Sequence, residues 1–150
     1  MELLLWRHAE AAEGAVDLAR ELTARGRRQA RQMAHWLDRH GPPGLEVWCS
    51  PAVRAQQTAA ALGRDARTLD ALAPGADAAA LLAATPWPDA DAAWLLVGHQ
   101  PALGRLAALV LTGREADWSI RRGAVWWLRS RQRGGIWQAG IYCVQTPELL

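Results

Sequence analysis

Hydrophobic and polar positions change along the chain with the periods of strands and helices in turn. Residues 2–6 are a nearly unbroken apolar run, which predicts a short buried strand. Thr23 suits the N-cap of a following amphipathic helix with an arginine-rich outer face, and the Gly-Pro-Pro-Gly run at 41–44 ends that helix. The apolar positions that recur in it at helical spacing are Ala30, Met33, Ala34 and Leu37.

A second strand and a second helix follow directly. Residues 45–49 predict a strand. Ser50 suits an N-cap and Pro51 suits the first helical position. We therefore expect a helix that opens at Ser50 and Pro51 and runs to about Leu62, with Gly63 as its C-terminal stop.

The middle of the chain is less regular. Residues 64–93 are rich in Ala, Pro and Asp, and predict a helix near 77–84 within a segment that is otherwise loop. Residues 94–97 predict a third strand, and residues 98–101 lead into a helix that Gly113 ends. The buried face expected for this helix comprises Leu103, Leu106, Ala107, Val110 and Leu111.

Two further strands are predicted at 124–129 and 136–144, joined by a turn at Gly134 and Gly135. Strands that alternate with helices indicate an α/β fold. We expect one domain, residues 1–150, with an open, mostly parallel sheet flanked by helices on both faces.

Composition narrows the class of protein. A chain of 150 residues that is 51% hydrophobic can bury a full core, and no apolar run reaches the ~20 residues of a membrane helix. Its two cysteines, Cys49 and Cys143, are far apart and expected to be reduced thiols, so we predict a cytoplasmic protein without a membrane partner.

All seventeen basic residues are arginine, yet the net charge is only +2. We considered a nucleic-acid surface built from the arginine-rich helix and the Arg121-Arg122 pair near tryptophans. Scattered arginines balanced by acids are more often a solvated face, so we expect no nucleic-acid partner.

Polar clusters follow each of the first three predicted strands. Arg7 and His8 follow the first, Arg54 lies shortly after the second, and His99 follows the third. Ligands of open α/β sheets bind beyond the carboxyl ends of the strands, so these side chains should share one crevice. Two arginines and two helix N-termini there suit a tetrahedral dianion, most simply phosphate.

Four segments together resemble the histidine phosphatase (phosphoglycerate-mutase-like) superfamily, most closely its SixA-type phosphohistidine phosphatases. The segments are LWRHA (5–9), LTARGRRQA (22–30), SPAVRAQQTA (50–59) and VGHQP (97–101). The resemblance implies that His8 is the nucleophile and forms a phosphohistidine intermediate. It also implies that Arg7, Arg54 and His99 bind the phosphate oxygens, on a phosphorylated protein or a small phosphorylated metabolite.

The chemistry of these residues agrees with the resemblance. A neutral imidazole is a competent nucleophile near pH 7, because its unperturbed pKa is ~6.5. Catalysis of phosphoryl transfer is mainly positioning and electrostatics, and His99 would contribute most when protonated beside the dianion. We expect no metal and no cofactor, because arginines already neutralise the phosphate.

The general acid is not identified by the sequence. Relatives commonly carry a glutamate in the loop after the second helix, where this chain has Ala71. Candidates for the proton donor are Asp70, Glu10, Glu13 and Asp77. An imidazole leaves easily without a proton donor, whereas an alkoxide does not, so a missing acid favours phosphohistidine as substrate.

Three other functions remain open or are weighed against this one. One is a small-molecule phosphomonoesterase acting on a nucleotide, sugar or cofactor-precursor phosphate, and another is a non-catalytic phosphate-binding module. A cysteine phosphatase using Cys49 and Arg54 is disfavoured, because only four residues separate them and Pro51 lacks a needed N–H donor.

Overall fold

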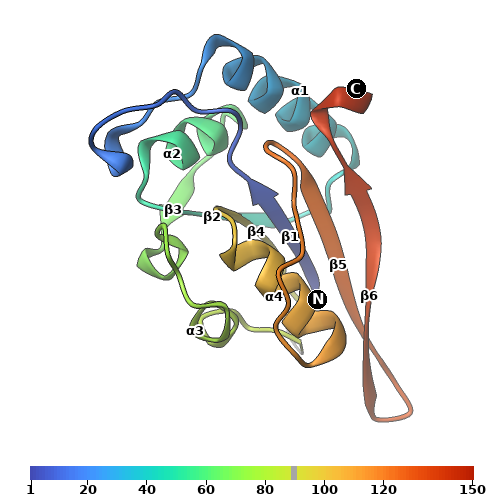
Figure 1. Ribbon diagram of the computed structural model, residues 1–150. Coiled ribbons are helices and arrows are strands. Elements are labelled where there is room, and N and C mark those ends of the chain that lie inside the picture. Colours follow the sequence, from blue (N-terminus) through green and yellow to red (C-terminus); the bar gives the residue numbers. More distant parts are fainter. Residues whose placement is uncertain (89–90) are drawn as a thin grey trace.

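A computed structural model describes residues 1–88 and 91–150. One six-stranded sheet runs through it in the order β3-β2-β4-β1-β5-β6 (Figure 1). The strands are β1 (Glu2–Arg7), β2 (Leu45–Cys49), β3 (Ala66–Thr68), β4 (Ala93–Gly98), β5 (Val125–Arg133) and β6 (Ile136–Gln145). The first four pair in parallel and the last two are antiparallel, so the predicted α/β class with a mostly parallel sheet is confirmed.

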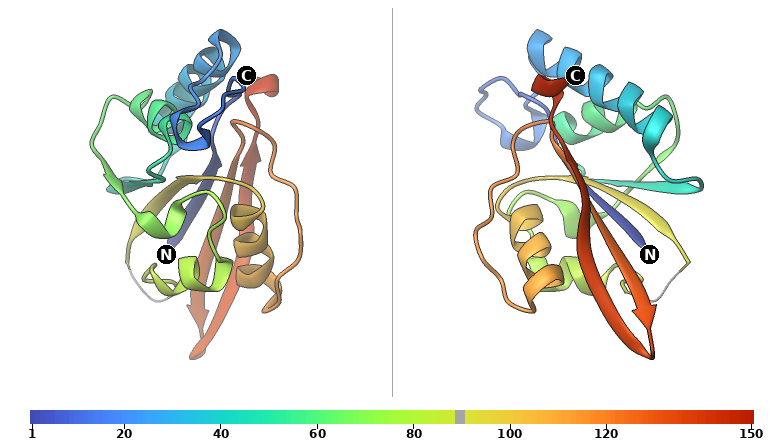
Figure 2. Two further views of the ribbon diagram at one scale, coloured as in Figure 1. Left: turned by 60° about the vertical axis from the view of Figure 1, so that its left-hand side comes forward. Right: turned by 90° about the vertical axis from the view of Figure 1, so that its right-hand side faces the viewer.

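Helices cover both faces of the sheet, as predicted (Figure 2). The α-helices are α1 (Ala24–His40), α2 (Val53–Ala60), α3 (Ala78–Ala83) and α4 (Ala102–Thr112), and short 3-10 turns lie at η1 (Asp17–Ala19), η2 (Asp70–Leu72) and η3 (Pro147–Leu149). Alternate residues of β1 explain the two layers. Leu4 and Trp6 pack with α1 and α2, whereas Leu3 and Leu5 pack with α3 and α4.

The first helix follows its sequence pattern. The Thr23 side chain accepts a hydrogen bond from the Gly26 N–H at 2.9 Å, as an N-cap should, and the four predicted apolar positions are buried. A Cβ on Gly26 would lie only 1.9 Å from the Glu10 carbonyl oxygen, so α1 approaches the segment after β1 through this glycine.

One predicted helix boundary is wrong, and one strand was not predicted. Helix α2 begins at Val53 rather than at Ser50 and Pro51, because the Ser50 hydroxyl accepts from the Ala52 N–H and contacts His99 instead of capping the helix. Residues 66–68, predicted as loop, form β3, which is held by parallel pairing with β2. Three residues are too few to show a strand period in sequence. The predicted helix near residue 77 is confirmed as α3.

Strands β5 and β6 form a long hairpin that extends past the amino end of β1. The register pairs Val125 with Trp6 and Arg129 with Glu2, so residues beyond 129 project from the far end of the sheet. The predicted turn is confirmed, with Gly134 and Gly135 both at positive φ. Among the described residues, none of the helices has the length and apolar character that crossing a bilayer requires.

Candidate active site

The structure brings the four predicted site residues together at the carboxyl ends of β1, β2 and β4. Arg7 ends β1 and is opposite Gly98 of β4, so His8 and His99 follow neighbouring parallel strands. Their ring centroids are 5.1 Å apart. Arg54, in the first turn of α2, places its Nε 3.4 Å from His8 Nε2. All but Arg7 are almost fully buried.

His8 is held in one tautomer. Its Nδ1 lies 2.7 Å from the Ala9 carbonyl oxygen, which only accepts hydrogen bonds, so Nδ1 carries the proton. The unprotonated Nε2 then faces Arg54. Burial lowers the pKa of His8 to about 4, and the charges of Arg54 and Arg7 act in the same direction. The imidazole is therefore neutral at neutral pH, and its Nε2 lone pair accepts a hydrogen bond from Arg54 Nε.

His99 lies beside His8 with one ring nitrogen satisfied. Its Nε2 is 2.7 Å from the Ser50 hydroxyl, while its buried Nδ1 has no hydrogen-bond partner in the described part of the chain. Burial, with smaller contributions from the neighbouring His8 and Arg54, lowers the pKa of His99 to about 3. The protonated form expected from the sequence is thus disfavoured in the free protein and requires an anion beside it.

Asp17 is part of the site, although no pattern in the sequence distinguishes it from the other acids of the 10–20 loop. Arg54 donates from Nη1 to the Asp17 carbonyl at 2.7 Å and from Nη2 to its carboxylate at 3.1 Å. Hydrogen bonds from Arg20 and Arg54 hold the pKa of Asp17 below its usual range. Asp17 therefore holds both Nη groups of the Arg54 guanidinium, and the Arg54 Nε is directed at His8.

Arg7 is anchored to the segment that precedes β5. Its Nη1 donates to the Ile120 carbonyl at 2.8 Å, and its buried Nε has no partner within residues 1–88 and 91–150. Burial and the charge of Arg122 lower the pKa of Arg7. This fixed guanidinium has donor capacity left for an anion.

The four candidate acids have different surroundings. Glu10 accepts from the Thr23 hydroxyl at 2.8 Å and pairs with Arg25 at 3.5 Å. Asp77 caps α3 by accepting from the Ala80 N–H. Glu13 and Asp70 are exposed to solvent. None of them contacts His8 or His99 in the described structure, and Ala71 has no group that could donate a proton.

The remaining chemistry-bearing side chains do not form a competing centre. Burial raises the pKa of the Cys49 thiol to about 12, so a thiolate nucleophile is not available there. Within the described residues, no three His, Cys, Asp or Glu side chains gather as metal ligands would.

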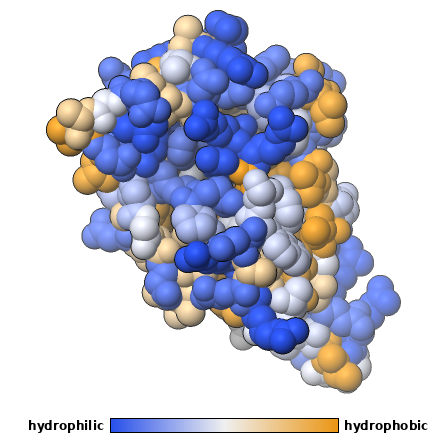
Figure 3. All heavy atoms as spheres, in the orientation of Figure 1, coloured by the Kyte–Doolittle hydropathy of each residue, from blue (hydrophilic) through white to orange (hydrophobic). Residues whose placement is uncertain are grey.

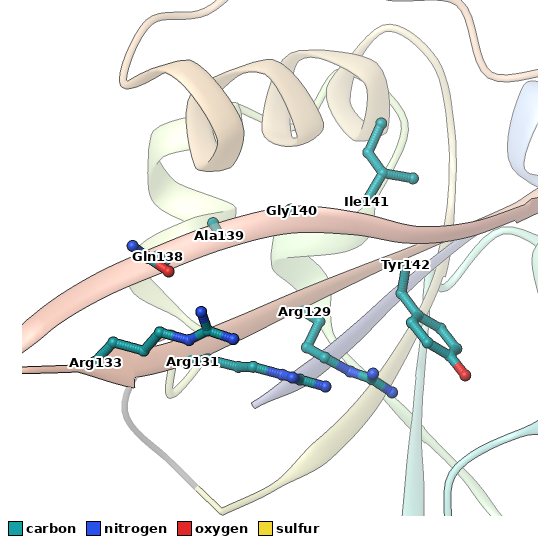
Figure 4. Close-up of a pocket in the computed structure, with 8 residues that line it drawn as sticks. All are labelled: Arg129, Arg131, Arg133, Gln138, Ala139, Gly140, Ile141 and Tyr142. Atoms are coloured by element: carbon teal, nitrogen blue, oxygen red, sulfur yellow. The ribbon is translucent and has the colours of Figure 1, made fainter.

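A second concavity lies on the β5–β6 hairpin, away from the histidines (Figure 4). Arg129, Arg131 and Arg133 lie along one side of it, and the Arg129 guanidinium stacks 3.7 Å from the Tyr142 ring centroid. This concavity contains arginines but no nucleophile, so we do not assign catalysis to it.

At the carboxyl ends of the strands, a buried neutral histidine lies beside arginines and a second histidine, and these groups together can bind a phosphate. The family model described as histidine phosphatase superfamily (branch 1) matches residues 3–73, which contain Arg7, His8 and Arg54. An uncharacterized protein of Picosynechococcus sp. is 35% identical over 141 residues, which cover 87% of this chain and 86% of that protein. The chain belongs to the histidine phosphatase superfamily.

Relatives whose names state a function belong to the same family. Phosphohistidine phosphatase SixA of Escherichia coli is 33% identical over 124 residues, covering 75% of this chain and 76% of SixA. A solved structure of the protein histidine phosphatase SixA complexed with tungstate superposes with a TM-score of 0.80 and 28% identity, covering 99% of both chains. The protein is therefore a SixA-like phosphatase, and not a non-catalytic phosphate-binding module.

Proposed function

We propose that this phosphatase removes the phosphoryl group from phosphohistidine on a protein, through a covalent intermediate on His8. The observation that carries the proposal is the state of His8 itself. Its Nδ1 proton is donated to the Ala9 carbonyl, its pKa is lowered to about 4, and its unprotonated Nε2 accepts a hydrogen bond from Arg54 Nε. A nucleophile in this state needs no base to activate it.

The reaction has two transfers. The Nε2 lone pair of His8 forms a bond to phosphorus as the bond from phosphorus to the substrate nitrogen breaks. The substrate ring, already protonated on its other nitrogen, leaves with that electron pair as neutral imidazole. Water then attacks the phosphorylated His8 and loses a proton to solvent, and inorganic phosphate leaves with neutral His8 restored.

Three side chains bind the phosphoryl oxygens in this proposal. Arg54 offers its remaining Nη protons, and also Nε once this group releases His8 Nε2. Arg7 offers its unpartnered Nε, and His99 offers its unpartnered Nδ1. When the Ser50 hydroxyl donates to His99 Nε2, the proton of His99 resides on Nδ1, the atom left for the phosphate. Fixed donors aimed at the oxygens stabilise the charge of the transition state without reorganising.

Among the described residues no carboxyl group is hydrogen-bonded to His8 or His99, and Asp17 is held by Arg54 and Arg20, which supports phosphohistidine over an alkyl phosphate. A leaving imidazole has a conjugate acid with a pKa of ~6.5, so it departs without help, whereas an alkoxide needs a proton. Asp70 and Glu13 are exposed, and the Asp77 carboxylate caps α3.

The free thiols of Cys49 and Cys143 suit a cytoplasmic site of action.

A small-molecule phosphomonoesterase is the second candidate, and Glu10 is the observation that favours it. Glu10 lines a pocket together with Arg7, which the proposal assigns to the phosphate. In that case Glu10 donates the proton to a departing alkoxide.

A substrate panel separates the two candidates. We would compare kcat/KM for a phosphohistidine protein, phosphoramidate, 4-nitrophenyl phosphate and sugar phosphates. The proposal predicts a high kcat/KM for the phosphohistidine protein and for phosphoramidate, and almost no turnover of the sugar phosphates. Sugar-phosphate turnover equal to that of phosphohistidine would contradict it and favour the phosphomonoesterase.

A further inference from the structure

A pocket lined by arginines opens beside Arg7, outside the group of residues that surrounds His8. Its charged residues are Arg7, Arg25, Arg121, Arg122, Glu10 and Glu148. They come from β1, the start of α1, the segment before β5 and the C-terminal turn. Figure 3 shows hydrophilic residues gathered over the part of this face where Figure 1 places the end of β1.

The turn that carries Arg121 and Arg122 is fixed to the backbone of the nucleophile. The Gly123 N–H donates to the carbonyls of both Arg7 and His8 at 3.1 Å. The Ala124 N–H closes the turn onto the Arg121 carbonyl at 3.0 Å. Gly123 has a φ of 75°, which a residue with a side chain rarely adopts. The backbone that carries the two arginines is therefore anchored to the backbone of His8.

The charges in this pocket are unbalanced. The Glu10 carboxylate accepts a hydrogen bond from the Thr23 hydroxyl and pairs with Arg25. Arg121 and Arg122 are exposed and form no ion pair in the described parts of the chain. Arg122 is close enough to lower the pKa of both Arg7 and His8. Clustered like charges are unfavourable in the empty protein and become favourable when an anion lies between them.

We propose that Arg121, Arg122 and Arg25 form a subsite for a second anionic group of the substrate, a carboxylate or a phosphate near the phosphoryl group that is transferred. The inference rests on the proposed function, because Arg7 is shared between the two anions. A long polyanion such as nucleic acid fits less well, since Glu10 and Glu148 line the same pocket. The subsite selects substrates with an acidic group close to the phosphorylated atom.

Direct binding tests the subsite without requiring turnover. We would measure by calorimetry at low salt the affinities for methylphosphonate and for 3-phosphonopropionate, which carries an added carboxylate. The wild type should bind 3-phosphonopropionate about tenfold more tightly, as one charge-assisted contact allows. The Arg121→Ala/Arg122→Ala double variant should lose this ratio. Arg131→Ala, which removes an exposed arginine of the hairpin, should retain it.

The outcomes distinguish the subsite from the proposed function. Equal affinities of the wild type for both phosphonates, or an unchanged ratio in the double variant, would refute the subsite alone. Binding of neither compound would refute the phosphoryl site and the subsite together.

Turnover of peptides identifies where the second anion comes from. Phosphohistidine peptides with a neighbouring Glu or Gln would be compared in kcat/KM. A preference for Glu that the double variant loses places the anion on a protein substrate. Equal rates, combined with the phosphonate preference, place it on a small molecule.

Discussion

At the scale of single residues, the state of His8 follows from its contacts. The Ala9 carbonyl fixes the proton on Nδ1, and burial keeps the ring neutral, so Nε2 is the reactive atom. In the proposed mechanism the arginines and His99 bind the anion, and His8 carries out the covalent step. Binding and chemistry therefore reside in different side chains.

This separation gives the first prediction. His8→Ala should abolish turnover, because the covalent step has no acceptor, while inorganic phosphate still binds with an affinity within about tenfold of wild type. Calorimetry with phosphate and a turnover assay with phosphoramidate measure the two properties. Appreciable turnover by the variant would exclude His8 as nucleophile.

The Arg54–Asp17 contact gives the second prediction. Asp17→Ala frees the outer edge of the guanidinium, so Arg54 samples orientations in which Nε no longer faces His8. We expect kcat/KM to fall by about tenfold. A charge-assisted hydrogen bond contributes about 1.5–3 kcal/mol, and the lower end of this range corresponds to about tenfold in rate.

Asp17→Asn is the matched control, because its side-chain oxygen can still accept from Arg54. It should recover part of the rate, whereas Arg54→Ala should weaken both phosphate binding and kcat. If Asp17→Ala matched the wild type in kcat and KM, the positioning role of Asp17 would be wrong.

At the scale of elements, the sequence was sufficient where parallel strands impose the geometry. Apolar runs that end in Arg7, Ser50 and His99 predict a shared crevice, because β1, β2 and β4 align their carboxyl ends. Asp17 was not predicted, since its contact joins residues 37 positions apart through an irregular loop. The start of α2 was misplaced because the Ser50 hydroxyl serves His99 instead of the helix.

The segment after β3 gives the third prediction. Ala71 lies where relatives commonly carry an acid, so negative charge should stay on the leaving atom during transfer. The rate should then depend steeply on leaving-group pKa, with each ~1.4 kcal/mol of added barrier lowering it about tenfold. A series of aryl and alkyl phosphates measures this dependence.

Glu10→Gln tests the alternative donor in the same series. If Glu10 supplies a proton, the wild-type dependence should be shallow and the variant's steep. A nearly flat wild-type line would contradict an acid-free site and favour the small-molecule phosphatase.

At the scale of the whole molecule, the buried histidines of the site lower the free energy of unfolding at low pH. His8 and His99 are buried in neutral form, with pKa values lowered to about 4 and about 3. In the unfolded chain their pKa is ~6.5, so below that pH the unfolded state binds more protons than the folded one. Stability due to these groups is therefore full above pH 6.5 and decreases as the pH falls toward 4.

The fourth prediction follows from this linkage. Between pH 7 and pH 5 the wild type should lose about 2 kcal/mol more unfolding free energy than His99→Gln, which lacks the titrating group. Urea denaturation at the two pH values measures it, with His35→Gln as an exposed-histidine control that behaves as wild type. Equal pH dependence in wild type and His99→Gln would show that His99 is not buried neutral.

The central claim is that the phosphoryl group passes through His8, and trapping the intermediate tests it most directly. The protein would be mixed with excess phosphoramidate, quenched within milliseconds at alkaline pH, digested and examined by mass spectrometry. We predict one phosphoryl group on the peptide that contains His8, absent from His8→Ala and lost on acid treatment. A protein that turns over phosphoramidate at full rate with no phosphoryl group on His8, or with the group on another residue, would contradict the account.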